Sequence, residues 1–547
     1  MDLLTESVMI LGLDFWPHVP IHRRISEPRL EALLRVEEFH VPISDDADAA
    51  HVPCRIFPLQ RVCLSCKRLA PMHTNAKKEY VCPDPTCGGK THPARFVVAC
   101  IKGHIDDFPW TEWVHQGPAC AEPKLYLRNR GTSAALSDLY VECDTCRKTR
   151  TMEGALSKGK KGVGSDSVLS QCSGNRPWLR DGESCRARPR GLLRGASNVY
   201  FSVTASSLSI PPWTDSLHLD VVRHWPTISK LIQDNKQEML KSLIPVLFPN
   251  QNEGDVMAAI ARKQGLAGAT DLRTDEWLVL RSRTPISKND FELVPQVVPA
   301  SIADWVENLA LVPRLREVRS LVGFTRIDPP DSESPPRPQA VQISRSPKNW
   351  LPAVEVFGEG VFIALNNAKL EEWERRSAVI GRSGKISDAY RNWKASLGQT
   401  VAEVPSRYIL LHTIAHVLIR ELSLESGYSS AAIGERVYAS AGTHGVLLYT
   451  AADDSEGSLG GLVLQGRPEN FEPTLRNALE GAMLCSSDPL CAENDPEITE
   501  TTNGAACHVC AFLSETSCER SNRLLDRLTL TPSRDNSFSF FNDFEET

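Results

Sequence analysis

A chain of 547 residues is too long to fold around one hydrophobic core, so we expect three or four domains. Its composition, 41% hydrophobic and 24% charged, is that of an ordinary globular protein, and its net charge of −7 argues against a protein that coats DNA unaided. No apolar run reaches the length of a membrane helix, and residues 1–20 lack the basic start and small-residue cleavage site of a secretory signal. We therefore expect a cytoplasmic protein with no membrane partner and with reduced cysteines.

Residues 1–60 are predicted to form an N-terminal segment of mixed structure. The turn signal Ser26-Glu27-Pro28 favours a helix over Glu27–Glu38.

Two cysteine clusters dominate residues 61–195. The members of the first are Cys63, Cys66, Cys82 and Cys87, and those of the second are Cys143, Cys146, Cys172 and Cys185. A two-residue gap places two thiolates on one tetrahedral ion, and a second pair completes its shell. The sequence therefore predicts a double zinc-ribbon-like module with two closed, structural zinc sites.

Three further cysteines, Cys54, Cys100 and Cys120, have no close partner in the sequence and are interpreted as ordinary buried cysteines of a core. Beside them, Arg95–Ile101 is predicted to be a buried strand that ends in a turn at Gly103. His104, Asp106 and Asp107 follow, and we expect them to cap this turn by hydrogen bonds to the backbone rather than to form a site.

The second cysteine cluster encloses a basic loop, Ser157–Ser165. From Cys143 to Arg194 the chain carries 12 Lys/Arg against 5 Asp/Glu. Basic loops on zinc modules can hold phosphates, so the candidate DNA contacts are Lys158, Lys160 and Lys161. The alternative is a solvated linker between two halves of a metal site.

Residues 196–327 are predicted to be mainly helical. One helix is expected over Trp225–Lys241, and another begins with Ser301 as its N-cap and places Trp305 and Leu309 on one face. A proline-rich linker, residues 328–345, follows.

The C-terminal part, residues 346–530, is predicted to be an α/β domain. Val354–Asn366 alternates like a hairpin with a glycine turn, and Ser406–Glu425 has the apolar period of a buried helix. Residues 445–466 indicate a strand, an acidic turn, a glycine-rich turn and a second strand.

His412 and His416 share one face of the predicted helix Ser406–Glu425, at a spacing that can chelate a metal. Together with acids such as Asp453 or Glu456 they define an alternative function, a metal-dependent nuclease or hydrolase. No third ligand is evident, and Thr413 stands where a zincin has its catalytic glutamate, so hydrogen-bonded core histidines are the favoured interpretation.

A third cysteine cluster predicts a third zinc ion, which brings the expected total to about three. Its members are Cys485, Cys491, Cys507 and Cys510, with Cys518 as an alternate ligand. Beyond it, residues 531–547 form an acidic tail whose phenylalanines, Phe538, Phe540, Phe541 and Phe544, indicate an edge strand or a docking segment.

The third cluster lies in the segments LCSSDPLC and NGAACHVCAFLSETSCERSNRLLDRL. These resemble the MrfA zinc-binding domain (MZB) of helicase-associated proteins, with Ala506 in place of the glycine before Cys507. The segments ACIKGHIDDFPWTEWVH, RGLLRGASNVYF, LLHTIAHVLIREL and EGSLGGLVLQG extend the likeness. With them, most of the chain is similar to DrmB-type subunits of the DISARM phage-defence system.

The resemblance implies a partner, a DrmA-like superfamily 2 helicase, which would hold the ATPase and the DNA-translocating motor. In agreement, the sequence contains no G-x-x-x-x-G-K-[ST] phosphate loop. We therefore expect an α+β, multidomain, zinc-stapled scaffold without catalytic or cofactor-binding residues, which supports DNA binding by the helicase in antiviral defence.

Overall fold

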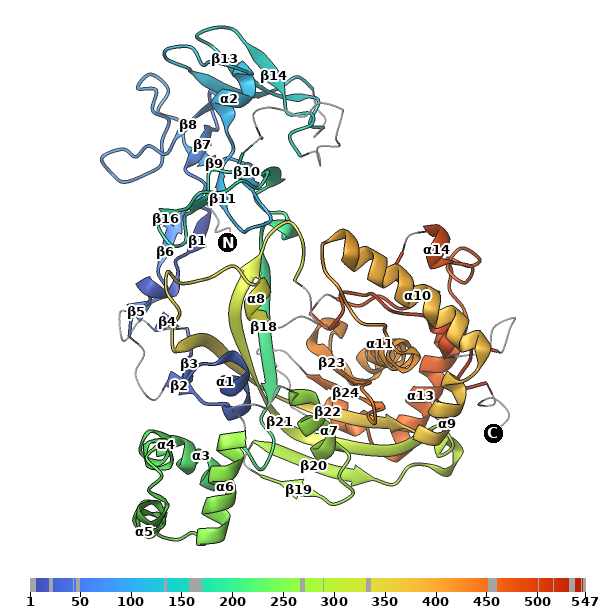
Figure 1. Ribbon diagram of the computed structural model, residues 1–547. Helices are drawn as coiled ribbons and strands as arrows, with labels where there is room; N and C mark the ends of the chain where they lie inside the picture. Colours follow the sequence, from blue (N-terminus) through green and yellow to red (C-terminus); the bar gives the residue numbers. More distant parts are fainter. Residues whose placement is uncertain are drawn as a thin grey trace. The chain divides into compact units, whose positions relative to one another are not determined.

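The computed structural model describes residues 6–18, 23–42, 44–45, 50–131, 135–156, 169, 171–265, 271–288, 290–330, 336–450, 460–499, 501–514, 516–530, 537–542 and 544. It shows a protein of mixed helices and sheets that divides into two compact units (Figure 1). Unit 1 comprises Met1–Arg24, Phe39–Ala205 and Ser320–Ala353, and unit 2 comprises Ile25–Glu38, Ser206–Arg319 and Val354–Thr547. Each unit gathers distant segments, which a division into consecutive ranges does not describe. Within the described ranges, no helix is both long and apolar enough to cross a membrane.

Unit 1 is built around a six-stranded antiparallel sheet with the order β14-β13-β12-β8-β7-β9. Its strands are β7 (Gln60–Cys63), β8 (Arg68–Pro71), β9 (Thr91–Pro93), β12 (Leu125–Asn129), β13 (Leu139–Cys143) and β14 (Thr149–Thr151). Helix α2 (Trp110–His115) contributes Trp110 and Trp113 to the apolar core beneath this sheet.

A second, three-stranded sheet of unit 1 has the order β11-β10-β17. Its strands are β10 (Phe96–Ala99), β11 (Ile105–Asp107) and β17 (Arg190–Leu193). The smaller pairs are β1 (Val8–Ile10) with β6 (Cys54–Ile56), β4 (Ser44–Asp45) with β5 (Ala50–His51), and β15 (Asn175–Arg176) with β16 (Asp181–Gly182). The predicted buried strand over Arg95–Ile101 is confirmed by β10, and the turn by Gly103, whose φ is 87°.

The largest sheet has nine strands, with the path β19-β20-β21-β22-β24-β23; in addition, β18 pairs with β21, and β3 pairs with both β2 and β22. The strands are β2 (Arg24–Ile25), β3 (Glu38–His40), β18 (Phe201–Leu208), β19 (Ile286–Ser287), β20 (Phe291–Gln296), β21 (Val306–Thr325), β22 (Trp350–Leu365), β23 (Ile433–Tyr438) and β24 (Gly445–Thr450). The predicted helix from Ser301 is wrong, because Trp305 directly precedes β21 and Leu309 lies within this strand. The predicted hairpin over Val354–Asn366 is also wrong, since β22 runs through it unbroken.

The helices of unit 2 form two groups (Figure 1). The first consists of α3 (Ser216–Arg223), α4 (Trp225–Gln233), α5 (Gln237–Leu247) and α6 (Glu253–Gly265), which share an apolar core. The predicted single helix Trp225–Lys241 is therefore divided, at Asn235 with φ 55°.

The second group packs with β23 and β24 around α11 (Ser406–Ser426), the core helix predicted over Ser406–Glu425. Its other members are α9 (Asn367–Glu374), α10 (Ser377–Ser396), α12 (Gly461–Gln465), α13 (Pro468–Met483) and α14 (Pro496–Thr499). The second strand expected in residues 445–466 is instead α12, while β24 is the first. From the tail, Phe540, Phe541 and Phe544 are buried in this core, which agrees with a docking segment.

Three further α-helices and five 3-10 turns complete the secondary structure of the described residues. The helices are α1 (Pro28–Leu34), α7 (Leu272–Leu280) and α8 (Pro336–Gln339), and the turns are Leu13–Phe15, Ser197–Val199, Ala300–Ile302, Ser430–Ala432 and Arg527–Thr529. The predicted N-terminal helix is confirmed but shorter, as Arg35 leaves it with φ 52°. In the predicted linker, residues 331–335 lie outside the described ranges, and Val341 forms a β-bridge with Phe324.

Candidate metal centres

Among the described residues, cysteines alone or cysteines with one histidine form four groups of candidate metal ligands, and a fifth group that also contains a glutamate is described further below. Within each group the candidate ligand atoms lie within 4.8 Å of one another. Unit 1 holds three groups: Cys63/Cys66/Cys82/Cys87, Cys100/His104/Cys172/Cys185, and His115/Cys120/Cys143/Cys146; unit 2 holds Cys485/Cys491/Cys507/Cys510. We call them groups 1 to 4 in this order. All sixteen cysteines are free thiols, so none of the groups is a set of disulfides.

Groups 1 and 3 are built on the same local turn. Cys63 ends β7 and Cys143 ends β13, and each is followed three residues later by the second cysteine of its pair. The next residue, Lys67 or Arg147, has a positive φ, 66° or 60°, and its N–H bonds back to the carbonyl of the first cysteine. The turn thus points two sulfur atoms of one strand end to the same place.

The sulfur–sulfur distances fit a tetrahedral metal ion. In group 1, Cys63 and Cys87 are 3.7 Å apart, as are Cys66 and Cys82. In group 4, the Cys485–Cys507 distance is 3.5 Å. A Zn–S bond of about 2.3 Å gives a tetrahedral S–S edge of roughly 3.8 Å, whereas a disulfide needs about 2.05 Å.

The two histidines in these groups each present one nitrogen to the sulfurs and use the other for support. His115 donates from Nδ1 to the Thr111 carbonyl at 2.7 Å and places Nε2 3.4 Å from Cys146 Sγ. His104 has Nδ1 3.3 Å from Cys100 Sγ, while its Nε2 contacts the Glu183 carboxylate at 2.9 Å. Outer partners of this kind fix the tautomer and orientation of a ligating imidazole.

The first thiol of each Cys-x2-Cys pair is prepared to ionise. Desolvation opposes this, but backbone N–H groups of the turn bond to the sulfur and lower the pKa of Cys63 to about 7 and those of Cys143 and Cys507 to about 6. Burial and neighbouring thiols raise the pKa of Cys66 to about 12. Four thiolates at one place therefore require a cation, and the residues present fit Zn²⁺.

The structure groups the cysteines of the predicted second site differently. Cys143 and Cys146 belong to group 3 with His115 and Cys120, whereas Cys172 and Cys185 belong to group 2 with Cys100 and His104. The physical reason is the fold: the turn between β10 and β11 carries Cys100 and His104 to the hairpin β15–β16, which Cys172 and Cys185 flank.

Four candidate ligands were therefore missed by the sequence interpretation: Cys100, His104, His115 and Cys120. The signals were present, since Cys100-x3-His104 and His115-x4-Cys120 each pair a thiol with a nearby imidazole. Cys54 is exposed and belongs to no group. Asp107 accepts hydrogen bonds from the backbone, but from the N–H groups of Leu59 and Gln60 rather than from the turn at Gly103 that it was expected to cap.

The candidate DNA contacts Lys158, Lys160 and Lys161 lie outside the described residues, as do Asp453 and Glu456. Cys518 does not join group 4. It lies with His412, His416 and Glu435 in a separate buried group.

Comparison with known proteins fits this arrangement. The family model of the MrfA Zn-binding domain matches residues 414–511, which include all of group 4, and that of a domain of unknown function (DUF8724) matches residues 1–201, which include groups 1 to 3. The DISARM protein DrmB of Bacillus paralicheniformis is 35% identical over 99% of both chains. The chain belongs to the DrmB family. Its MZB region is thus one part of a DrmB-type protein rather than the whole.

Proposed function

We propose that this DrmB-type chain is a zinc-stapled, non-catalytic scaffold that binds a DrmA-like superfamily 2 helicase and supports its DNA binding and translocation in anti-phage defence. The observation that carries the proposal is the closed shell of groups 1 to 4. Each offers four protein ligands, as structural zinc sites do, whereas catalytic zinc keeps a position open for water or substrate.

The absence of a phosphate loop from the sequence supports the assignment of the motor to a partner. The hydrolase alternative finds no support among the described residues. His412 and His416 are both 0% exposed, so a phosphodiester has no access to them.

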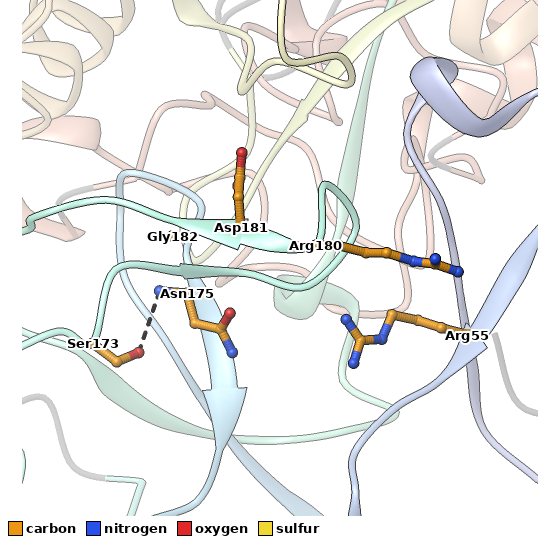
Figure 2. Close-up of a pocket in the computed structure, with 6 residues that line it drawn as sticks. All are labelled: Arg55, Ser173, Asn175, Arg180, Asp181 and Gly182. Carbon is orange, nitrogen blue, oxygen red and sulfur yellow. Dashed lines mark hydrogen bonds between the residues drawn. The ribbon is translucent and has the colours of Figure 1, made fainter.

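For DNA, the described residues of unit 1 offer a hollow of 660 Å³ with two arginines and Asp181 in its lining. Arg55 and Arg180 reach it from different segments, next to Ser173 and Asn175 (Figure 2). Arg55 is held by a 3.1 Å hydrogen bond to the Pro177 carbonyl, and Arg180 lies over the Phe15 ring at 4.9 Å. Two positioned guanidinium groups suit phosphate oxygens, so we propose this hollow and the Lys158–Lys161 loop as the sites of DNA contact.

The helicase part of the proposal is tested by mixing the purified chain with the DrmA-like helicase encoded alongside it. We expect a complex on size exclusion, ATP hydrolysis only in the presence of the helicase, and tighter DNA binding by the complex than by the helicase alone. ATP turnover by this chain alone, or no complex at all, would contradict the scaffold function.

The DNA part is tested by the salt dependence of binding by the complex. Arg55→Ala/Arg180→Ala and Lys158→Ala/Lys160→Ala/Lys161→Ala should each weaken binding to all sequences and reduce the log–log salt slope by about 0.9 per lost duplex contact. Lys236→Ala/Lys241→Ala, on exposed ion-paired lysines of unit 2, is the control. A slope that changes equally in all three variants would show only a general charge effect.

A further inference from the structure

His412, His416, Glu435 and Cys518 meet in the interior of unit 2, apart from group 4. The two histidines lie one turn apart on α11, the glutamate lies on β23, and the cysteine lies in the segment after the Cys507–Cys510 pair. The side chains of His412, His416 and Glu435 are 0% exposed. The helix α11, the strand β23 and the segment after Cys510 thus bring four potential ligands together in the interior.

The distances within this group are close to the edges of a metal coordination shell, with both His412 distances somewhat shorter. His412 Nε2 is 3.2 Å from Cys518 Sγ and 3.0 Å from Glu435 Oε1, and His416 Nε2 is 3.6 Å from the same oxygen. Zn–N and Zn–O bonds of about 2.1 Å and a Zn–S bond of about 2.3 Å give tetrahedral edges of roughly 3.4 to 3.6 Å.

His416 supplies the strongest argument. Its Nδ1 lies 2.7 Å from the Ala511 carbonyl, which can only accept, so Nδ1 carries a proton. In the neutral ring Nε2 then presents a lone pair, is buried, and has no hydrogen-bond partner among the described residues. It faces the Glu435 carboxylate, which is also an acceptor, so either a second ring proton or a cation must lie between them.

Cys518 resembles the sulfurs of the zinc groups. Its Sγ accepts the backbone N–H groups of Arg520 at 3.3 Å and Asn522 at 3.2 Å. The turn that aims these groups contains Ser521 and Asn522 with φ 51° and 58°. Cys172 of group 2 accepts the Gly174 N–H in the same way, at 3.3 Å. Such N–H bonds favour the thiolate, the form that binds metal.

The charges balance if a divalent cation is present. A Cys518 thiolate and the Glu435 carboxylate carry two negative charges between two neutral imidazoles, and Oε2 of Glu435 has no partner among the described residues. Uncompensated charges are costly in so buried a place, whereas one divalent ion neutralises both.

We propose that His412 Nε2, His416 Nε2, a Glu435 carboxylate oxygen and Cys518 Sγ form a fifth metal site, which binds Zn²⁺. Imidazole with one thiolate and one carboxylate is a donor set that suits this ion. With four protein ligands and no exposed face the site is structural, and it fastens α11 to β23 and to the chain after group 4. His412 and Cys518 fall outside residues 414–511 of the MZB match.

The test uses the full-length chain loaded with ¹¹³Cd²⁺ in place of zinc and examined by NMR. Cadmium bound by three or four sulfurs resonates far downfield of cadmium bound mainly by nitrogen and oxygen. We expect one upfield signal besides those of groups 1 to 4. Cys518→Ser should remove or shift that signal alone and lower the zinc content of the native protein by one equivalent, while the control Cys54→Ser changes nothing.

A wild-type spectrum without a signal outside the sulfur-rich region overturns the proposal and leaves a buried His–Glu hydrogen-bond network. This measurement needs no variant, so it decides even if Cys518→Ser fails to fold. The result is also independent of whether the chain binds a helicase.

Discussion

In unit 1 the members of three Cys/His groups lie at the ends of short strands or helices and in the turns and loops between them, whereas unit 2 combines group 4 with a large apolar core around α11. The ligands of group 4 lie within Cys485–Cys510, but those of group 2 enclose the whole of group 3. Short strands bury little apolar surface, so we expect metal binding to contribute more to the stability of unit 1 than to that of unit 2. Unit 2 has both a large hydrophobic core and a group of candidate metal ligands.

The largest expected effect follows from removing all metal. Structural zinc contributes about 10–16 kcal/mol in small zinc peptides, so chelation under reducing conditions should unfold the metal-bearing part of unit 1 first. Hydrogen exchange should show β7, β12 and β13 losing protection while β22 and β24 keep theirs. Equal loss in both units would show that the core of unit 2 depends on metal just as strongly.

Replacing single histidines tests the nested arrangement. His104→Ala and His115→Ala should each lower the zinc content by one equivalent, because each removes one ligand of group 2 or 3. If Cys143, Cys146, Cys172 and Cys185 formed one site instead, neither change would release metal. His73→Ala, at an exposed histidine outside every group, is the control for mass spectrometry of the native protein.

Unit 2 contains a buried network of ion pairs that does not involve metal. Replacing its central arginine tests how much this network stabilises the unit. Arg436 contacts Glu276 and Glu317 at 2.8 Å, and all three side chains are at most 2% exposed. Arg436→Met should destabilise this core by about 3–5 kcal/mol, because it leaves buried carboxylates uncompensated. Arg314→Met removes a 46% exposed partner of Glu292 and should cost less than about 1 kcal/mol. Hydrogen exchange of β23 and β24 measures both.

We expect acid to destabilise the two units at different pH values, which is a smaller effect than those above. Burial opposes ionisation of Glu317, but Arg436 and Arg319 lower its pKa from 4.5 to about 2. A carboxyl whose pKa falls on folding stabilises the fold above the unfolded value, so this contribution is complete above pH 4.5 and is lost towards pH 2. Thiolates bind metal less well as acid competes for them. We therefore expect zinc release and exchange in unit 1 at a higher pH than exchange in β23. The opposite order would contradict the comparison.

Patterns within a short stretch of sequence predicted a helix correctly, but failed where contacts between distant segments determine the structure. The helical period of Ser406–Glu425 predicted α11 correctly because its apolar positions face a core, with the exposed Leu424 as the exception. The glycines of β22 were taken for a turn, but they allow close packing: a Cβ on Gly358 would lie 2.4 Å from Thr450 Oγ1, and one on Gly360 2.8 Å from the Leu448 carbonyl oxygen. That neighbour, β24, is distant in the sequence.

The start of α12 shows the same limit. Its Leu462 N–H is accepted by the buried Glu359 carboxylate at 2.8 Å, a cap that is more than a hundred residues away. No local residue provides this stabilisation, so the apolar segment after the glycines indicated a strand.

For the candidate sites, the Cys-x2-Cys pairs were predictable because each pair lies within a few consecutive residues. Their partners were not, since pairing by order in the sequence joined Cys143 to Cys172, whereas the fold inserts His115 and Cys120. Glu435 could not be identified as a candidate ligand from the sequence either, because only the packing of β23 on α11 brings it to His412.

The nesting of group 3 inside group 2 has a consequence for synthesis on the ribosome. As the chain emerges from its N-terminus, the ligands of group 1 are complete at Cys87 and those of group 3 at Cys146, but those of group 2 only at Cys185. Cys100 and His104 therefore emerge without their partners and remain so while the members of group 3 are completed. Group 2 can be completed only after Cys185 has emerged. Correct folding of the nascent chain therefore requires that Cys100 and His104 do not bind metal together with cysteines of the other groups before then.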